Sequence, residues 1–178
     1  MRYLGNKESM LTEISDLLES QGLLKEGFSF FDAFCGSGSV SDYFKSYYDI
    51  IINDNLTWSV LYTKGRICAP VCTFTKLGFD PFEYLNSNET VLQGFMYKNY
   101  APTESARMYF TPENAGRIDY FRKRIEDWKN DNLLSEEEYC YLMACLIESV
   151  SDVSNTAGVY GAFLKKWDSR ATKNIVFN

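Results

Sequence analysis

The 178 residues of the chain are 46% hydrophobic and 24% charged, as in ordinary globular proteins, and no apolar run approaches the roughly 20 residues that span a bilayer. The absence of histidine excludes Ser-His-Asp and Cys-His catalysis, and five cysteines at spacings of no zinc or disulfide framework predict reduced thiols and no metal site. The net charge of −6 argues against a nucleic-acid partner unless basic residues gather locally, and an N-terminus without an apolar signal core predicts a cytoplasmic location.

Helical and strand patterns alternate in the N-terminal half. Apolar residues recur at helical spacing over 8–20. Two short apolar segments, 28–34 and 48–53, are typical of buried strands, and a glycine-rich loop and a helical segment over 40–47 separate them. A further helix is expected over 57–67. This order predicts a βαβ unit with a parallel sheet, and therefore the α/β fold class.

The pattern changes after residue 85, and we expect an α/β part over 1–85 followed by a mainly helical region over 86–178. Residues 86–114 show no clear period and are expected to be loop-rich, with Asp80-Pro81-Phe82 forming a turn that enters them. Two helices follow, and the second begins at Ser135-Glu136-Glu137-Glu138, which is a capping-box pattern.

The residues that could carry chemistry begin at the end of the first strand, in Asp32-Ala33-Phe34-Cys35-Gly36-Ser37-Gly38. Glycines there let the backbone turn sharply, and open α/β sheets bind ligands at the carboxyl ends of their strands. Asp54 ends the second strand, 22 positions after Asp32, where it could accept hydrogen bonds from ribose hydroxyls or cap the next helix. The missing third glycine disfavours NAD and leaves other adenosine-bearing cofactors, while a tight turn without a ligand is the alternative.

A third motif, Arg2-Tyr3-Leu4-Gly5-Asn6-Lys7, precedes the first helix. Together with Asp32-x-Phe34-x-Gly36-x-Gly38 and Asp54, it makes the chain resemble the Dam-like alpha group of DNA adenine-N6 methyltransferases. The stretch from Ser154 to Phe163 resembles the family segment upstream of the catalytic motif, so the resemblance covers nearly the whole chain. It implies a partial Rossmann-like, S-adenosylmethionine-dependent methyltransferase fold with a mainly helical target-recognition region, and methylation of adenine in double-stranded DNA of the restriction-modification type.

The resemblance also implies a role for each motif residue at the cofactor S-adenosylmethionine. Tyr3 would pack on the methionine or adenine end, Lys7 would pair with the methionine carboxylate, and Asp32 would lie near the methionine amino group. A packing aromatic and a solvated charge are the alternatives for Tyr3 and Lys7. Phe34 and the backbone of Gly36 and Gly38 would line the cofactor cleft. Asp54 would accept hydrogen bonds from the ribose hydroxyls.

One departure from the family pattern is the Asp/Asn-Pro-Pro-Tyr/Phe/Trp tetrapeptide that holds the flipped adenine, which the sequence does not contain. The nearest string, Asp80-Pro81-Phe82-Glu83, lacks the second proline. We therefore expect an N-terminal portion without catalytic residues, inactive alone, whose open sheet edge is completed by a second chain or a C-terminal fragment. The alternatives are an inactive S-adenosylmethionine- or DNA-binding protein, and a small-molecule or RNA methyltransferase that shares the cofactor loop.

DNA contacts, if made, are expected in the recognition region and the tail, where lysines and arginines would hold phosphate and amides would read base edges. Ordinary solvated loop charge is the alternative for each residue. The candidates are Lys98, Tyr100, Asn155, Thr156, Tyr160, Lys165, Lys166 and Arg170.

Overall fold

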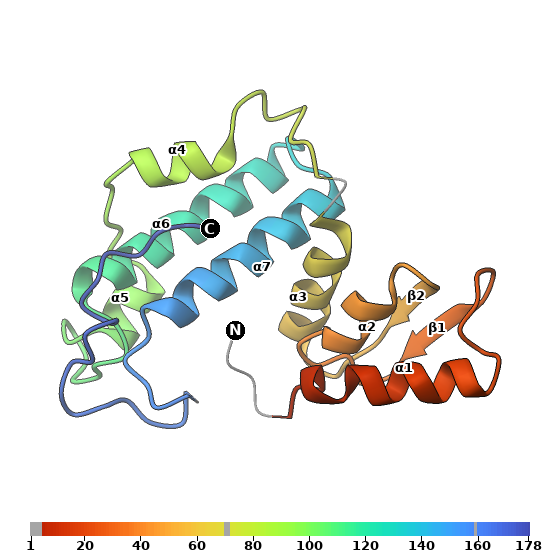
Figure 1. Ribbon diagram of the computed structural model, residues 1–178. Helices are drawn as coiled ribbons and strands as arrows, with labels where there is room; N and C mark the ends of the chain where they lie inside the picture. Colours follow the sequence, from red (N-terminus) through yellow and green to blue (C-terminus); the bar gives the residue numbers. More distant parts are fainter. Residues whose placement is uncertain (1–4, 70–71, 159) are drawn as a thin grey trace.

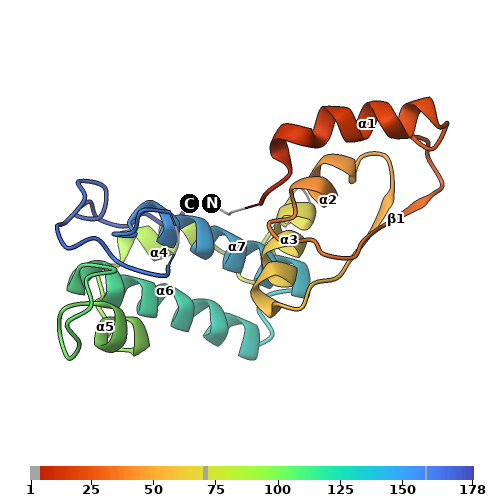
Figure 2. The same ribbon diagram turned by 90° about the horizontal axis from the view of Figure 1, so that it is seen from below.

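The computed structural model describes residues 5–69, 72–158 and 160–178. A small α/β lobe and a helical lobe meet at helix α3, as two perpendicular views show (Figures 1 and 2). The elements in chain order are η1 (Glu8–Met10), α1 (Leu11–Ser20), β1 (Ser29–Asp32), α2 (Ser39–Phe44), β2 (Asp49–Ile52), α3 (Thr57–Cys68), α4 (Pro81–Ser87), α5 (Phe95–Tyr100), α6 (Pro112–Asn130) and α7 (Glu136–Asp152).

The predicted βαβ unit is confirmed, since β1 and β2 pair in parallel with α2 between them in the chain. Side chains alternate across the strands, and Phe30 stacks on Phe44 of α2 with ring centroids 5.4 Å apart. On the opposite face, the register partners Phe31 and Ile51 are 60% and 53% exposed. The expectation that both strands are buried is wrong: every residue of β1 and β2 is exposed or half-buried, because α2 packs against one face of the sheet and the other apolar face is open.

The helical lobe contains most of the core. Helix α7 begins at Ser135 with the expected capping box, in which the Ser135 hydroxyl accepts the Glu138 N–H and the Glu138 carboxylate accepts the Ser135 N–H. Buried apolar side chains from α6 and α7, among them Phe121, Ile125 and Leu142, pack between the two helices. Their burial removes apolar surface from water, which is the main driving force for the lobe to fold.

In the middle of the chain, one expectation was wrong, and a second holds for most of its stretch but missed a short helix. Asp80 caps α4 by accepting N–H bonds from Phe82 and Glu83, with Pro81 at the first helical position, so this segment starts a helix rather than a simple turn. The stretch expected to be loop-rich contains α5, whose first N–H groups, those of Met96 and Tyr97, donate to the carboxylate of Asp119 on α6. The predicted domain boundary between residues 85 and 86 lies within α4, and the division into two domains stays a prediction.

Asparagine side chains hold the tail, residues 171–178, against the helices. The buried Asn114 amide donates to the carbonyls of Ala171 and Lys173 and accepts the N–H of Ile175. Asn86 binds both backbone groups of Phe177, at 2.8 Å each. These side-chain amides satisfy both N–H donors and carbonyl acceptors of the tail backbone, as a neighbouring strand does in a sheet.

All five cysteines lie in the described part of the chain and are free thiols. Burial raises the pKa of Cys72, Cys140 and Cys145 to about 11, so these thiols are protonated at neutral pH. Within the described ranges, no group of three or more Cys, Asp or Glu side chains is placed to hold a metal ion, and no helix is long and apolar enough to cross a membrane.

Candidate functional site

The glycine loop leaves β1 and turns directly into α2. The Gly38 N–H donates to the Cys35 carbonyl at 2.7 Å, and both Gly36 (φ 53°) and Gly38 (φ 72°) have left-handed backbone conformations. Residues other than glycine rarely adopt this left-handed backbone conformation, which explains the glycines at these two positions. Gly38 is also the N-cap of α2, so the loop places the N-terminus of that helix beside the carboxyl ends of both strands.

Asp54 joins the end of β2 to this loop. One carboxylate oxygen accepts the Gly36 N–H at 2.9 Å, and the other accepts the Leu56 N–H at 2.9 Å. The bond from Leu56 first, and then that from Gly36, hold the pKa of Asp54 below its ordinary value. The N-cap of α3 is Leu56, so the carboxylate of Asp54 organises the loop rather than serving as the N-cap residue. An ionised carboxylate has about four acceptor positions, so it can accept further hydrogen bonds.

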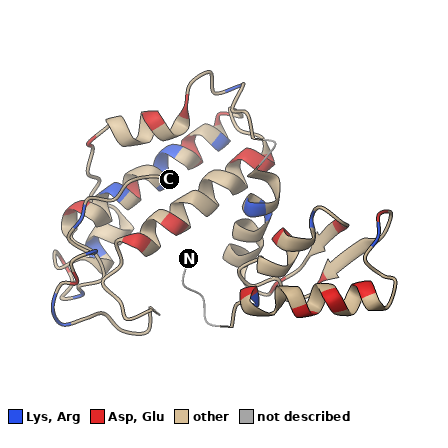
Figure 3. Ribbon diagram, in the orientation of Figure 1, with Lys and Arg blue, Asp and Glu red and all other residues tan. Residues whose placement is uncertain are grey.

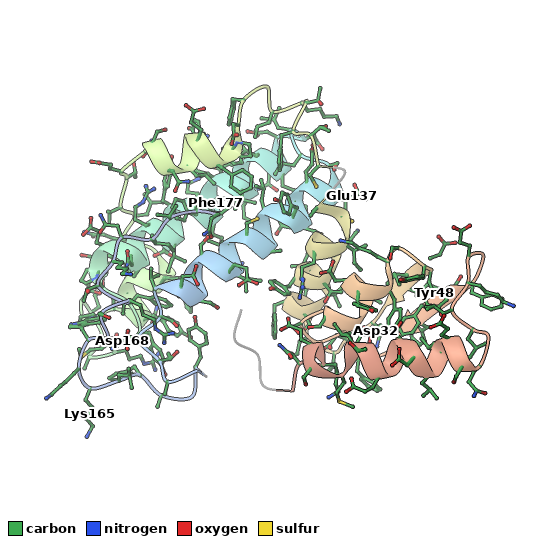
Figure 4. All side chains as sticks on the ribbon, in the orientation of Figure 1. Asp32, Tyr48, Glu137, Lys165, Asp168 and Phe177 are labelled. Carbon is green, nitrogen blue, oxygen red and sulfur yellow. The ribbon has the colours of Figure 1, made fainter. Side chains whose placement is uncertain are left out.

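Asp32 and Phe34 lie at the same edge of the sheet. The Asp32 carboxylate accepts the hydroxyl hydrogen of Ser41 on α2 at 2.6 Å, and its carbonyl accepts the Asn53 N–H at 2.9 Å. Figure 4 shows Asp32 in the α/β lobe beside α2. Phe34 is 86% exposed, the highest value among the large hydrophobic residues of the described ranges. An aromatic ring in this position offers a stacking surface at the mouth of the loop.

Helix α3 supports the loop from the other side. The Arg66 guanidinium donates to the Ser37 carbonyl at 3.0 Å and to the Asp42 carboxylate at 2.9 Å, and Lys45 donates to the same carboxylate at 2.8 Å. A cavity of about 400 Å³ adjoins these groups and is also lined by Glu8, which directly follows the N-terminal motif. The cavity has a volume typical of small-molecule sites, but it lies on the α3 side of the loop, and none of the candidate cofactor residues Asp32, Phe34, Gly36, Gly38 and Asp54 lines it.

Of the seven residues predicted to bind a cofactor, the structure brings together Asp32, Phe34, Gly36, Gly38 and Asp54. Tyr3 lies outside the described residues. Lys7 is exposed, and its ammonium group donates to the Gly5 carbonyl at 3.2 Å, so its link to the other five stays a prediction. Sequence reasoning missed Ser41, Arg66 and Thr63, whose hydroxyl donates to the Gly36 carbonyl at 3.5 Å, because polar residues within a helix carry no signal of the loop that they contact.

Two residues predicted to bind DNA are used inside the protein. The Asn155 side chain is fully buried; it donates to the carbonyls of Met108 and Leu164 and accepts the Asp168 N–H. Thr156 is also buried, and its carbonyl accepts a hydrogen bond from Arg170. Both side chains thus shape the segment 153–170, and direct DNA contact by either stays a prediction.

The remaining candidates lie closer to solvent. Lys165 and Lys166 are exposed, and Lys165 points away from the protein in Figure 4. Tyr160 is half exposed and packs on Tyr109, with ring centroids 6.2 Å apart. Arg170 lies 3.7 Å from the Asp168 carboxylate and, with Tyr160, lines a second cavity of about 390 Å³.

Two candidates belong to the α5 segment. Lys98 is an exposed lysine whose ammonium group lies 3.9 Å from the Glu104 carboxylate. Tyr100 packs on Tyr109 with ring centroids 5.4 Å apart, and the Arg107 guanidinium lies over its ring. Because Tyr109 also contacts Tyr160, the α5 segment and the segment 153–170 meet through aromatic rings.

Comparison with known proteins gives a family match over almost the whole chain. Residues 3–177 match the family described as D12 class N6 adenine-specific DNA methyltransferase. Modification methylase LlaI of Lactococcus lactis subsp. lactis is 42% identical over 182 residues, covering 98% of this chain and 29% of that protein. Type II methyltransferase M.FokI of Planomicrobium okeanokoites is 38% identical over 179 residues, covering 96% of this chain and 28% of that protein. Type II methyltransferase M.NlaIII of Neisseria lactamica is 35% identical over 184 residues, covering 98% and 52%. The chain thus spans between about a quarter and a half of these relatives, and no solved structure gives a significant match.

Proposed function

Since the chain belongs to the D12 class of N6 adenine-specific DNA methyltransferases, we propose that it supplies the cofactor loop and the target-recognition region for transfer of a methyl group to adenine in double-stranded DNA. The relatives are named modification methylases and type II methyltransferases, which supports a restriction-modification role. The order of the motifs supports membership of the Dam-like alpha group, which is part of this proposal. A cytoplasmic location stays a prediction.

The observation that carries the proposal is the Asp54–Gly36 bond beside the exposed ring of Phe34. It holds three groups suited to an adenosine at one sheet edge: a carboxylate for ribose hydroxyls, glycine backbone that allows close approach, and an aromatic face for stacking. S-adenosylmethionine fits this set and, when bound, supplies an activated methyl group on its sulfonium. The residues present therefore agree with this cofactor in chemistry as well as in order along the chain.

Each residue has a stated part in binding. Asp54 accepts the ribose hydroxyls with the acceptor positions that Gly36 and Leu56 leave open. Asp32, whose carboxylate Ser41 orients, attracts the methionine amino group, and Lys7 pairs with the methionine carboxylate. Tyr3 packs on the cofactor in this proposal, while Phe34 and the backbone at Gly36 and Gly38 line the cleft.

We place the DNA-facing surface on the segment 153–170 and the adjoining α5 segment. Exposed Lys165, Lys166 and Lys98 supply charge for phosphates, and Asn155 and Thr156 keep the segment in shape from within. The cavity at Tyr160 and Arg170 offers hydroxyl and guanidinium donors to phosphate or base edges. Figure 3 shows acidic residues along α1, in the other lobe, so part of the negative net charge lies away from this surface.

The open face and edges of the two-stranded sheet support a second part of the proposal. Exposed Phe31 and Ile51 are ordinary interior residues for a larger sheet, so further strands from a second chain or a C-terminal fragment would pair with the open edges, and the helices that connect such strands would cover this face. In this proposal, such strands also bring the base-holding tetrapeptide, and residues 1–178 alone do not methylate DNA.

Calorimetric titration of the chain with S-adenosylmethionine tests the cofactor part. Phe34→Ala is expected to weaken binding by roughly tenfold, because it removes a stacking surface. Phe95→Ala is the matched control, since Phe95 is another exposed phenylalanine, on α5 in the other lobe. An equal affinity for both variants and the unmodified chain would show that Phe34 is not part of the site. Absence of binding by the unmodified chain would refute the cofactor part of the proposal.

Transfer of labelled methyl groups to mixed DNA duplexes tests the activity part. No transfer is expected from the chain alone, and transfer is expected after a fragment with the tetrapeptide is added. Binding of DNA without cofactor binding would favour the alternative of an inactive DNA-binding protein.

A further inference from the structure

Residues 62–66 of helix α3 contact both helix α7 and the glycine loop. Tyr62 donates its hydroxyl hydrogen to Glu148 of α7, and a methyl group at Gly65 would come within 2.4 Å of the Cys140 carbonyl oxygen, so these residues lie against α7. Thr63 and Arg66 lie against the glycine loop instead. The loop is therefore backed by a helix that is itself held closely on the helical lobe.

The contacts from α3 to the loop are specific. A methyl group at Gly38 would come within 2.6 Å of the Thr63 hydroxyl oxygen, so the loop backbone lies directly on that fully buried side chain. The Arg66 fork reaches the Ser37 carbonyl and the Asp42 carboxylate at the start of α2. Arg66 thus joins the middle of the loop to the helix that the loop leads into.

From these contacts we propose that Arg66, seated beside Thr63, is a positioning residue that fixes the glycine loop in its cofactor-binding conformation. The inference rests on the proposed function, because it names the residue that prepares the same cofactor site. Its chemical basis is the planar guanidinium, which binds two acceptors at a fixed spacing, whereas an ammonium group acts as a point charge.

Asp42 keeps this fork in place. Its carboxylate accepts hydrogen bonds from both Arg66 and Lys45, and Lys45 also donates to the Arg66 carbonyl at 3.1 Å. One guanidinium nitrogen is thereby anchored to α2 while the other holds the Ser37 carbonyl. Each terminal nitrogen of the guanidinium makes one hydrogen bond within the protein, so Arg66 acts on the loop from both ends of the fork.

Hydrogen exchange on the purified chain without cofactor provides the first test. Arg66→Met is expected to speed exchange of the backbone amides over 36–40 by about tenfold or more, because the loop loses its fork. Arg66→Lys is expected to fall between Arg66→Met and the unmodified chain. Lys64→Met is the matched control. Lys64 is on the same helix and pairs with Glu136, the first residue of α7, so this variant loses the same charge without removing a contact to the loop.

Titration of the same variants with S-adenosylmethionine provides the second test, with affinity expected to fall by about tenfold for Arg66→Met and to stay unchanged for Lys64→Met. Unchanged loop exchange in Arg66→Met overturns the inference, and so does faster exchange spread equally over α6 and α7, which would mean general destabilisation. If Arg66→Lys keeps the backbone amides over 36–40 as protected as in the unmodified chain, the planar guanidinium is not required, which contradicts its proposed role. An unmodified chain that binds no cofactor refutes the proposed function, while loop exchange still decides whether Arg66 fixes the loop.

Discussion

Gly65 of α3 lies against the backbone carbonyl of Cys140 on α7, at a separation that leaves no room for a side chain, since a methyl group would sit 2.4 Å from that oxygen. The same methyl group would come within 2.7 Å of Ala144, so α7 closes the space on both sides. This contact joins the lobe that contains the glycine loop to the helical lobe.

Gly65→Ala is therefore expected to lower the free energy of unfolding by about 1–3 kcal/mol, as overpacked cores do. Helix propensity alone would give the opposite sign, a gain of about 1 kcal/mol. Chemical denaturation measures the difference. Gly161→Ala is the control, since nothing lies within 4 Å of a methyl group there, and a stabilised Gly65→Ala would contradict the close approach.

Asp54→Asn is expected to weaken S-adenosylmethionine binding by roughly 10- to 100-fold, because it removes a charged acceptor from a partly satisfied network. Since the pKa of Asp54 is depressed below 3.8, its contribution is present above that pH and is lost as the pH falls through the lower folded value. Titrations between about pH 5 and 8 should give a constant contribution from Asp54. An affinity that changed within this range through Asp54 would show that the carboxylate is not held ionised as the structure indicates.

Asn114→Ala is expected to lower the free energy of unfolding by at least about 2 kcal/mol, because it leaves the buried Ile175 N–H and two tail carbonyls without a partner. Asn114→Asp keeps an acceptor for Ile175 but loses both donors, so it should be no better. Thermal and denaturant unfolding measure the change. Asn99→Ala, which removes an exposed helix amide, should change stability by no more than about 0.5 kcal/mol.

The double variant Lys165→Ala/Lys166→Ala is expected to weaken DNA binding at every sequence and to lower the salt dependence of the affinity by about two phosphate contacts. Fluorescence anisotropy over a range of salt concentrations measures both effects. Lys76→Ala/Lys123→Ala removes the same charge from exposed positions elsewhere. Equal losses for the two double variants would show a general charge effect, and not a surface at the segment 153–170.

The features that sequence predicted well are those encoded locally. The capping box at Ser135 and the left-handed glycines at Gly36 and Gly38 depend on residues within a few positions, and the two strands follow from continuous apolar runs. The family resemblance, based on ordered motifs, gave the site residues that meet at the sheet edge. Local chemistry was therefore enough to predict the frame of the glycine loop.

What sequence missed depends on contacts between distant residues. Helix α5 is short and has a glycine before it, and it is capped by Asp119, 23 positions from Met96. The polar character of Asn155 gave no sign that it is buried with three backbone partners, one at Met108 and two further along its own segment at Leu164 and Asp168. Arg66 gave no signal because one of its acceptors is a backbone carbonyl, which is independent of residue type, and the other, the Asp42 carboxylate, is 24 positions away in the chain.

The amides of Asn86, Asn114 and Asn155 hold the tail and the segment 153–170 without any net charge. Screening by salt weakens ion pairs between exposed groups but has little effect on buried bonds between neutral dipoles. The shape of the proposed DNA surface should therefore be the same at low and high ionic strength. In a plot of log affinity against log salt for this chain, any part of the slope that comes from rearrangement of the protein would then come from its ion pairs, such as Arg170 with Asp168, and not from these amides.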